Sequence, residues 1–266
     1  MHVYVINLMT SHDRREYIVS QLARARVTDY RIVPGTDGRS VDPNDAGIVD
    51  QDVRAVTGDW LRGGAVACAL SHLAVYRQVL KDGADYAVVL EDDAVLPSDF
   101  QGIAREISST IGSADVALLY YSRQHERRPC ELSAFGAKSL DPSRTLALPI
   151  DINQPAGGVA YVISRECCSR MLDHFPPIQA TADAWGFFQH LGIIHRLWCV
   201  SPALVGVAPF RSTIGYTGYF TLKGELLSWI DSRRVFPFYQ LARFRRQRKL
   251  MGRGQAIVVS EEPRWQ

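Results

Sequence analysis

The stretch DYAVVLEDDAVLPSDF, residues 85–100, decides the fold. Its apolar, β-branched run at residues 86–90 is bounded by polar residues, which predicts a buried strand. The run leads directly into three consecutive acids, Glu91, Asp92 and Asp93. Adjacent carboxylates repel one another unless water, a cation or a partner relieves the repulsion. Two interpretations follow: a strand that ends in a solvated turn, or a metal site.

Strand and helix patterns alternate on both sides of this stretch. Apolar runs predict further strands over residues 2–8, 30–33, 114–121, 157–164 and 195–207. Helical spacing predicts helices after Ser11 and over residues 61–81, 97–111 with Ser98 as N-cap, 165–175 and 182–194. Residues 34–47 are turn-rich, and residues 122–156 are polar and irregular. The alternation predicts an α/β domain with a mixed, mostly parallel, Rossmann-like sheet flanked by helices.

The composition places the chain among ordinary globular proteins. Hydrophobic residues make up 47% of the 266 residues and charged residues 22%, enough for a real core. The net charge of +2 gives no reason to expect a nucleic-acid partner. Five cysteines without CxxC spacing indicate reduced thiols in a cytoplasmic protein. We expect no signal peptide at the N-terminus, and no window approaches the roughly 18 apolar residues of a membrane span.

The acidic turn has the geometry of a cation site. Side chains alternate faces along an extended segment, so Glu91 and Asp93 point one way and Asp92 the other. Ligands of open α/β sheets bind beyond the carboxyl ends of the strands, where these acids lie. Two carboxylates on one face suit Mg²⁺ or Mn²⁺, which complete their shells with water and phosphate oxygens.

Five ordered motifs carry a resemblance to a known family. They are VINLMTSHDRR, PGTDGR, GGAVACALSHLAVYRQVL, YAVVLEDDAVL and GGVAYVIS, and the match that they carry covers roughly residues 2–215. In this order they resemble glycosyltransferase family 25, which includes lipooligosaccharide β-galactosyltransferases and collagen galactosyltransferases. The resemblance implies a GT-A-type domain over residues 1–219, a UDP-sugar donor and Mn²⁺, or Mg²⁺ in its place.

The resemblance makes the acidic turn the counterpart of the DxD-type motif of such enzymes. Asp93 is then the first choice as metal ligand, with Glu91 as a second ligand or as a partner of the ribose. Asp92 would orient loop backbone in the donor site, or be the ligand instead. A metal that spans the two phosphates of a UDP-sugar would stabilise the departing diphosphate.

Further donor-binding residues follow from the same motifs. Asn7, Arg14 and Arg15 could hold the uridine and a phosphate, because arginine suits bidentate phosphate contact. The alternative is a surface arginine pair. Asp37 belongs to the D-G turn of the second motif, whose glycine we expect to serve turn geometry. Ser71, followed by a histidine in CALSH, is either a donor-site residue or structural.

The later motifs supply further donor-site residues and the acceptor side. By the resemblance, Gly157 and Gly158 are donor-binding residues in the sugar or acceptor pocket. Gly157 and Gly158 permit close approach of a substrate, or form a bulge. Asp183 corresponds to an aspartate of the family and would be the base that deprotonates the acceptor hydroxyl. Its alternative is a helix N-terminal aspartate stabilised by the dipole. Trp185 could stack on a sugar ring. A third metal ligand is not apparent, although His195 is a candidate.

The last segment, residues 220–266, differs in character. Eight Lys and Arg residues lie between Arg233 and Arg253 with no acid, interleaved with aromatic side chains. This composition fits a peripheral segment on an anionic membrane, here the inner face of the cytoplasmic membrane. The alternatives are a solvated helix or a nucleic-acid-binding arm.

The combined prediction is an inverting, metal-assisted hexosyltransferase. It would move galactose from UDP-galactose to a glycan or glycolipid acceptor such as a lipooligosaccharide core. The alternatives are an inactive nucleotide- or carbohydrate-binding module of the same fold, another UDP-sugar, or a protein acceptor.

Overall fold

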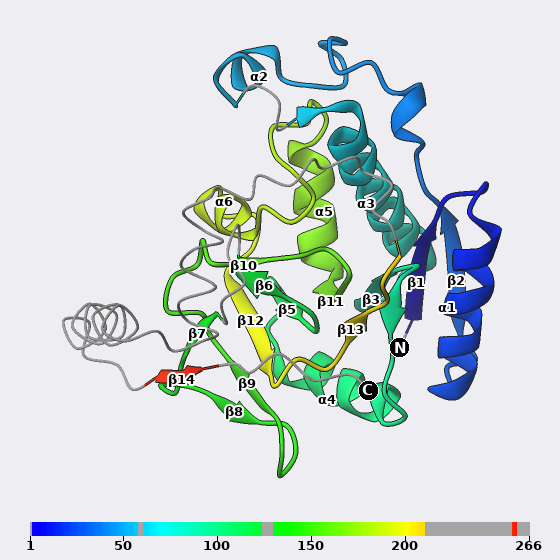
Figure 1. The fold of residues 1–266 in the computed structure, drawn as a ribbon. Coiled ribbons are helices and arrows are strands. Elements are labelled where there is room, and N and C mark those ends of the chain that lie inside the picture. Colours follow the sequence, from blue (N-terminus) through cyan, green and yellow to red (C-terminus); the bar gives the residue numbers. More distant parts are fainter. Residues whose placement is uncertain (1, 58–60, 124–129, 211–256, 260–266) are drawn as a thin grey trace, which may run out of the picture.

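The computed structural model describes residues 2–57, 61–123, 130–210 and 257–259. A central sheet runs through this part of the chain (Figure 1). Its strands, in spatial order, are β2 (Tyr30–Pro34), β1 (His2–Asn7), β3 (Tyr86–Glu91), β11 (Ala160–Ser164), β5 (Asp115–Leu118), β12 (Arg196–Ser201), β9 (Thr145–Ala147) and β8 (Lys138–Ser139).

The direction of the strands makes this a mixed, mostly parallel sheet. Six of the eight strands point the same way, while β11 and β9 run opposite to their neighbours. The predicted fold class is therefore confirmed. The antiparallel β11, inserted between β3 and β5, is the departure from a regular parallel arrangement.

Helices cover both faces of the sheet and define two hydrophobic cores. On one face, α1 (His12–Arg24) and α4 (Phe100–Thr110) pack against Val5, Val88 and Leu90. On the other face lie α3 (Gly63–Asp82), α5 (Arg165–His174) and α6 (Trp185–His190). Each strand supplies alternate residues to the two cores, as strand geometry requires.

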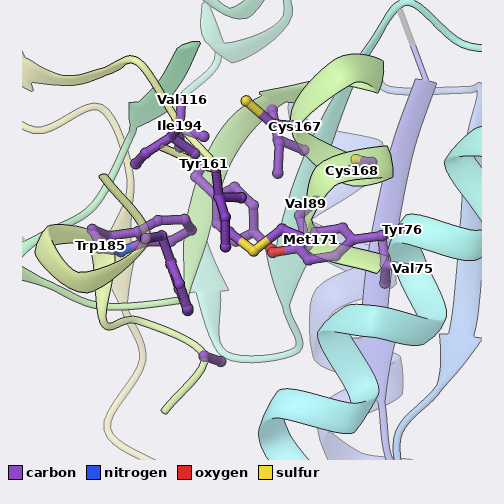
Figure 2. Packing of buried hydrophobic residues seen from close by; sticks show 14 of the residues in the cluster. Val75, Tyr76, Val89, Val116, Tyr161, Cys167, Cys168, Met171, Trp185 and Ile194 are labelled. Carbon is purple, nitrogen blue, oxygen red and sulfur yellow. The ribbon is translucent and has the colours of Figure 1, made fainter. Parts of the chain in front are cut away.

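The core under α3, α5 and α6 is rich in aromatic rings. Tyr161 and Trp185 are fully buried, and their rings meet edge to face with centroids 5.0 Å apart. Figure 2 shows both rings together with Tyr76 and Met171. This packing fixes the start of α6 against β11, which matters for the position of Asp183 described below.

Several local details differ from the sequence predictions. Within the turn-rich region and after it, the chain forms a 3₁₀ helix, η1 (Gly38–Ser40), and α2 (Gln51–Thr57). The N-cap of α4 is Asp99, not Ser98. Short strand pairs join β4 (Ala94–Val95) to β13 (Gly206–Val207), β6 (Ser122–Arg123) to β10 (Pro155–Ala156), and β7 (Glu131–Ser133) to β14 (Ile257–Val259).

The basic segment predicted to bind a membrane lies outside the described residues. Of residues 220–266, the structure describes only β14, which pairs with β7. Within the described parts of the chain, no helix combines the length and the apolar character needed to cross a bilayer. All five cysteines lie in the described residues, and none of them pairs with another in a disulfide.

Glycine residues allow the backbone of η1 to pack closely against the backbone at the start of α3. A Cβ added at Gly38 would lie 2.7 Å from Gly64 Cα, a backbone atom that cannot move aside independently. A Cβ at Gly63 would lie 2.7 Å from the Gly38 carbonyl oxygen. Close backbone approach, in addition to turn geometry, therefore explains Gly38.

We expect Gly38→Ala to lower the free energy of unfolding by about 1–3 kcal/mol, because the added methyl overpacks this contact. The matched control is Gly102→Ala in α4, where a Cβ meets nothing within 4 Å. That exposed helical site should gain about 0.5–1 kcal/mol. Urea denaturation of both variants measures the difference. A neutral or stabilising Gly38→Ala would contradict the packing argument.

Candidate functional site

A cavity of about 490 Å³ opens at the sheet edge where β1 and β3 end. These two strands run parallel, so the residues that follow them meet at one edge. The lining comes from the β1–α1 connection, the turn after β2, one face of α3 and the end of β3. It comprises Ile6, Leu8, Thr10, Ser11, Arg14, Gly35, Thr36, Asp37, Gly38, Arg39, Gly64, Ala67, Cys68, Ser71, His72, Glu91 and Asp92.

Asp92 is buried and organises the wall of this cavity. Its Oδ2 accepts a hydrogen bond from Asn7 Nδ2 at 2.7 Å, and its Oδ1 accepts one from Arg14 Nε at 2.7 Å. All three residues are buried, with at most 9% of each residue exposed. Because both oxygens are engaged by side chains, Asp92 fixes Asn7 and Arg14. These partners are side chains, so the predicted role of orienting loop backbone is not what the structure shows, and the alternative role of Asp92 as a metal ligand stays a prediction.

Asp93 is held on one oxygen only. Arg14 Nη2 donates to Asp93 Oδ2 at 2.9 Å, while Asp93 Oδ1 is buried and has no hydrogen-bond partner among the described residues. Burial and the charge of Glu91 raise the pKa of Asp93 to about 6. The single positive charge of Arg14 therefore does not balance the negative charges of the acidic turn, so the turn can also accept a cation.

His72 faces Glu91 from α3. The imidazole is 2% exposed, and its Nδ1 lies 2.6 Å from the Tyr161 hydroxyl. That hydroxyl lies 2.9 Å from the hydroxyl of Tyr76. His72 Nε2 has no hydrogen-bond partner within the described structure and lies 3.6 Å from Glu91 Oε1. The ring is thus oriented by a buried tyrosine pair and presents its free nitrogen to the acidic turn.

Cys68 joins these residues and was not predicted from the sequence. It lies one helical turn before His72, and donor atoms of Cys68, His72 and Glu91 all lie within 4.8 Å of one another. Burial and the carboxylates of Glu91, Asp183 and Asp93 raise the pKa of the Cys68 thiol. The available signal was the four-residue spacing of cysteine and histidine in CALSH, which places both on one helix face.

Gly157 and Gly158 precede β11, Asp183 precedes α6, and none of the three is part of the cavity lining. Gly157 has φ +130° and its N–H donates to Asp183 Oδ2 at 3.1 Å, while the Thr181 hydroxyl donates to Asp183 Oδ1 at 2.8 Å. A Cβ added at Gly158 would lie 3.0 Å from Glu91 Oε1. The two glycines therefore link the predicted base to the acidic turn.

Other predicted donor residues separate into those at the cavity and those away from it. Arg14 lines the cavity, whereas Arg15 is exposed on α1 and is not part of the lining. Asp37 lines it as the N-cap of η1, where hydrogen bonds from Arg39 lower the pKa of Asp37. Ser71 lines it too, and its hydroxyl accepts from Thr36 N–H at 2.8 Å, which pins the turn to α3.

Two predicted residues have different surroundings from those expected. Trp185 is 0% exposed, and its Nε1 donates to the Gly157 carbonyl oxygen at 3.1 Å. No face of the indole is open, so the predicted stacking on a sugar ring does not fit. It supports the backbone of Gly157 instead. His195 is not a third metal ligand at the acidic turn, because its Nε2 lies 3.1 Å from Arg170 Nη1 near the surface.

Comparison with known proteins places the chain in a family. Residues 1–185 match the family model described as glycosyltransferase family 25 (LPS biosynthesis protein). The chain belongs to glycosyltransferase family 25. The match includes β1, α3, β3 and β11, the elements that position the cavity and the acidic turn.

Individual relatives in this family are distant. The chain is 26% identical over 184 residues to a bovine (Bos taurus) protein named probable inactive glycosyltransferase 25 family member 3, covering 65% of this chain and 29% of that protein. It is 29% identical over 123 residues to the putative glycosyltransferase R655 of Acanthamoeba polyphaga mimivirus, covering 45% and 36%. The chain thus spans about a third of the length of these relatives.

A solved structure of UDP-glucose pyrophosphorylase in complex with UDP-glucose also matches the fold. The superposition covers 74% of this chain and 89% of that chain, with 11% sequence identity and a TM-score of 0.39. A likeness at this level carries no functional inference.

The divalent cation that family 25 membership implies can be tested against the donors present. Asp93 offers a buried oxygen without a partner in the described residues, and the nearby charge of Glu91 raises the pKa of Asp93. Hard cations such as Mn²⁺ and Mg²⁺ prefer carboxylate oxygens. The pair Glu91 and Asp93 therefore fits such an ion, whereas both oxygens of Asp92 already accept hydrogen bonds from Asn7 and Arg14.

Proposed function

We propose that the chain is an inverting, metal-assisted hexosyltransferase that uses a nucleotide-diphosphate sugar. The observation that carries the proposal is the acidic turn. Glu91 and Asp92 line the cavity, and Asp93, which follows them outside the lining, has a buried Oδ1 without a partner among the described residues. The cavity volume of about 490 Å³ lies within the usual range of small-molecule sites, roughly 300–1,000 Å³. Family membership supports the reaction class.

The donor would occupy the cavity with its diphosphate toward the acidic turn. Glu91 and Asp93 would hold the divalent cation, which when bound supplies Lewis-acid stabilisation of the departing diphosphate. Arg14, fixed by Asp92, offers a guanidinium suited to phosphate oxygens. Asp37 and the backbone of the turn that Ser71 pins offer polar groups for the nucleoside.

The acceptor hydroxyl would lose its proton to Asp183. The Gly157 N–H and the Thr181 hydroxyl each bond one carboxylate oxygen, which fixes the orientation of the group. The remaining lone pairs of each oxygen can accept a proton from the attacking hydroxyl. We propose galactose from UDP-galactose as the transferred sugar and a lipooligosaccharide core as the acceptor, in line with the family description.

One observation favours a second candidate, a binding module without transferase activity. Arg14 already contacts both Asp92 and Asp93, so a fixed protein cation partly compensates the turn. The matched bovine relative is itself named as probably inactive. In this alternative the cavity binds a nucleotide or a sugar and no bond is broken.

Slow UDP release separates the two candidates. The protein is incubated with UDP-galactose, UDP-glucose, UDP-N-acetylglucosamine and UDP-glucuronic acid, each with Mn²⁺, with Mg²⁺ or with a chelator. We expect release from UDP-galactose with Mn²⁺ and none with the chelator. Calorimetric binding of UDP without release from any donor would favour the binding module. If the protein neither binds UDP nor releases UDP from any donor, the proposed donor site is wrong.

A further inference from the structure

Three donor atoms of different chemistry meet at one wall of the cavity. Sγ of Cys68, Nε2 of His72 and a carboxylate oxygen of Glu91 all lie within 4.8 Å of one another. Cys68 and His72 come from successive turns of α3, and Glu91 ends β3. The cluster shares Glu91 with the acidic turn but contains neither Asp92 nor Asp93.

The orientation of His72 is that of a metal-binding imidazole. Its Nδ1 is engaged by the Tyr161 hydroxyl at 2.6 Å, which is itself 2.9 Å from the Tyr76 hydroxyl. Metal-ligating histidines almost always donate their second ring N–H to such a partner. In the tautomer whose Nδ1–H donates to Tyr161, Nε2 carries a lone pair toward the cluster, and this nitrogen is buried without a hydrogen-bond partner in the described part of the chain.

The separation of His72 and Glu91 is too long for a hydrogen bond and suits a bridging ion. Nε2 and Oε1 lie 3.6 Å apart, beyond the usual range for N–H···O. Two ligands bonded at roughly 2.0–2.2 Å to a tetrahedral zinc ion lie about 3.3–3.6 Å apart. Without an ion, a nitrogen lone pair facing a carboxylate would be repulsive.

Gly158 leaves the space beside this pair open. A Cβ at this position would lie 3.0 Å from Glu91 Oε1 and 3.3 Å from His72 Nε2. Any other residue would therefore place carbon against both donors. The glycine keeps their surroundings clear of side-chain atoms.

We infer that Cys68, His72 and Glu91 form a binding site for a Zn²⁺-class ion, with the cavity side as the position for a fourth ligand. Thiolate and imidazole donors favour zinc over the hard cations that carboxylates alone select. The inference does not depend on the proposed transfer reaction. The zinc site has one consequence for the proposed transfer reaction. A zinc ion bound to Glu91 would compete with a cation held by Glu91 and Asp93.

Cobalt spectroscopy of the full chain tests this site. Co²⁺ is titrated into chelator-treated, desalted protein. We expect an intense near-ultraviolet thiolate-to-cobalt band together with visible bands of tetrahedral strength. Zn²⁺ should displace the cobalt and abolish the spectrum, whereas Mn²⁺ at the same concentration should not. The absence of a thiolate band in the wild-type protein would overturn the inference.

Variants assign the spectrum to the three donors. Cys68→Ser should lose the thiolate band, and Tyr161→Phe should weaken Zn²⁺ affinity by about 10–100-fold, the usual effect of removing a partner of a ligating histidine. Gly158→Ala should weaken binding while leaving every donor atom in place. The control is Cys168→Ala, which removes a buried thiol of α5 that is not part of the cluster. A thiolate band that survives Cys68→Ser would refute the site.

A second measurement needs no variant, in case a substitution prevents folding. Iodoacetamide labelling of wild-type Cys68, mapped by mass spectrometry, should slow when Zn²⁺ is added and stay unchanged with Mn²⁺. Equal labelling with and without Zn²⁺ would count against the site. Neither measurement uses a sugar donor, so failure of UDP release would leave both results intact.

Discussion

Asp93→Asn is expected to abolish metal-dependent transfer and, in the metal-free protein, to stabilise the fold. Both effects follow from one carboxylate that is buried, near Glu91, and bonded on one oxygen by Arg14. An amide is a neutral and weaker ligand for a hard cation. The substitution also removes a buried negative charge that destabilises the folded state. The oxygen of the new amide can still accept a hydrogen bond from Arg14.

The pH dependence fixes the sign of the stability effect. The folded pKa of Asp93 is raised from 3.8 to about 6, so the ionised form is less favourable in the folded state than in the unfolded chain. This destabilisation is absent below the unfolded pKa, grows as the pH rises toward 6, and is complete above it. A shift of this size corresponds to up to about 3 kcal/mol at neutral pH.

Urea denaturation of chelator-treated protein measures this effect, and UDP release with Mn²⁺ measures the loss of transfer. Asp93→Asn should gain free energy of unfolding at neutral pH and little near pH 4. Asp173→Asn, an exposed site on α5, should change neither property. Wild-type turnover in Asp93→Asn would refute the metal assignment, and a loss of stability at neutral pH would refute the electrostatic argument.

Asp183→Asn is expected to leave UDP binding intact and to lower the rate of transfer by about 10²–10⁴-fold, the usual scale for a general base. The carboxylate accepts from Gly157 N–H and from the Thr181 hydroxyl. An amide of the same shape keeps one of these contacts but cannot take a proton from the acceptor hydroxyl. The loss should therefore appear in the turnover number, with the affinity for UDP unchanged by calorimetry.

Thr181→Val is the matched control for this prediction. It removes the hydroxyl that bonds Asp183 Oδ1 while the carboxylate and its bond to Gly157 remain. We expect a far smaller loss of turnover than in Asp183→Asn. If both variants instead lose thermal stability, with activity per folded molecule unchanged, then Asp183 serves the structure and the base lies elsewhere.

Much of the fold could be predicted because its strands and helices have clear periodicity. The long helix α3 and the strand β3 lie close to where their apolar patterns place them. The direction of β11 could not be predicted, since the pattern that indicates a buried strand is the same in either direction. The short α2 was missed because seven mostly polar residues give too little periodicity to read.

The site could be predicted in part, because sequence indicates residue types but not local environments. Consecutive residues of a helix point about 100° apart, so only one member of the pair Arg14 and Arg15 can face the cavity. An aromatic residue beside a candidate base can be exposed or buried, and Trp185 is buried by the rings around it. Cys68 could not be predicted as a site residue, because its proximity to Glu91 depends on how β3 packs beside α3, which the sequence does not indicate.

The reversed strand β11 has a consequence for how this protein can diverge. Because β5 ends and β11 begins at the same edge of the sheet, the chain between Leu118 and Ala160 departs from the cavity side and returns to it. Insertions or deletions in this connection leave the pairing of both strands in register. Lineages could therefore vary the parts of this connection outside β8 and β9 without rebuilding β1, β3 and α3, and we expect sequence variation among homologues to concentrate there.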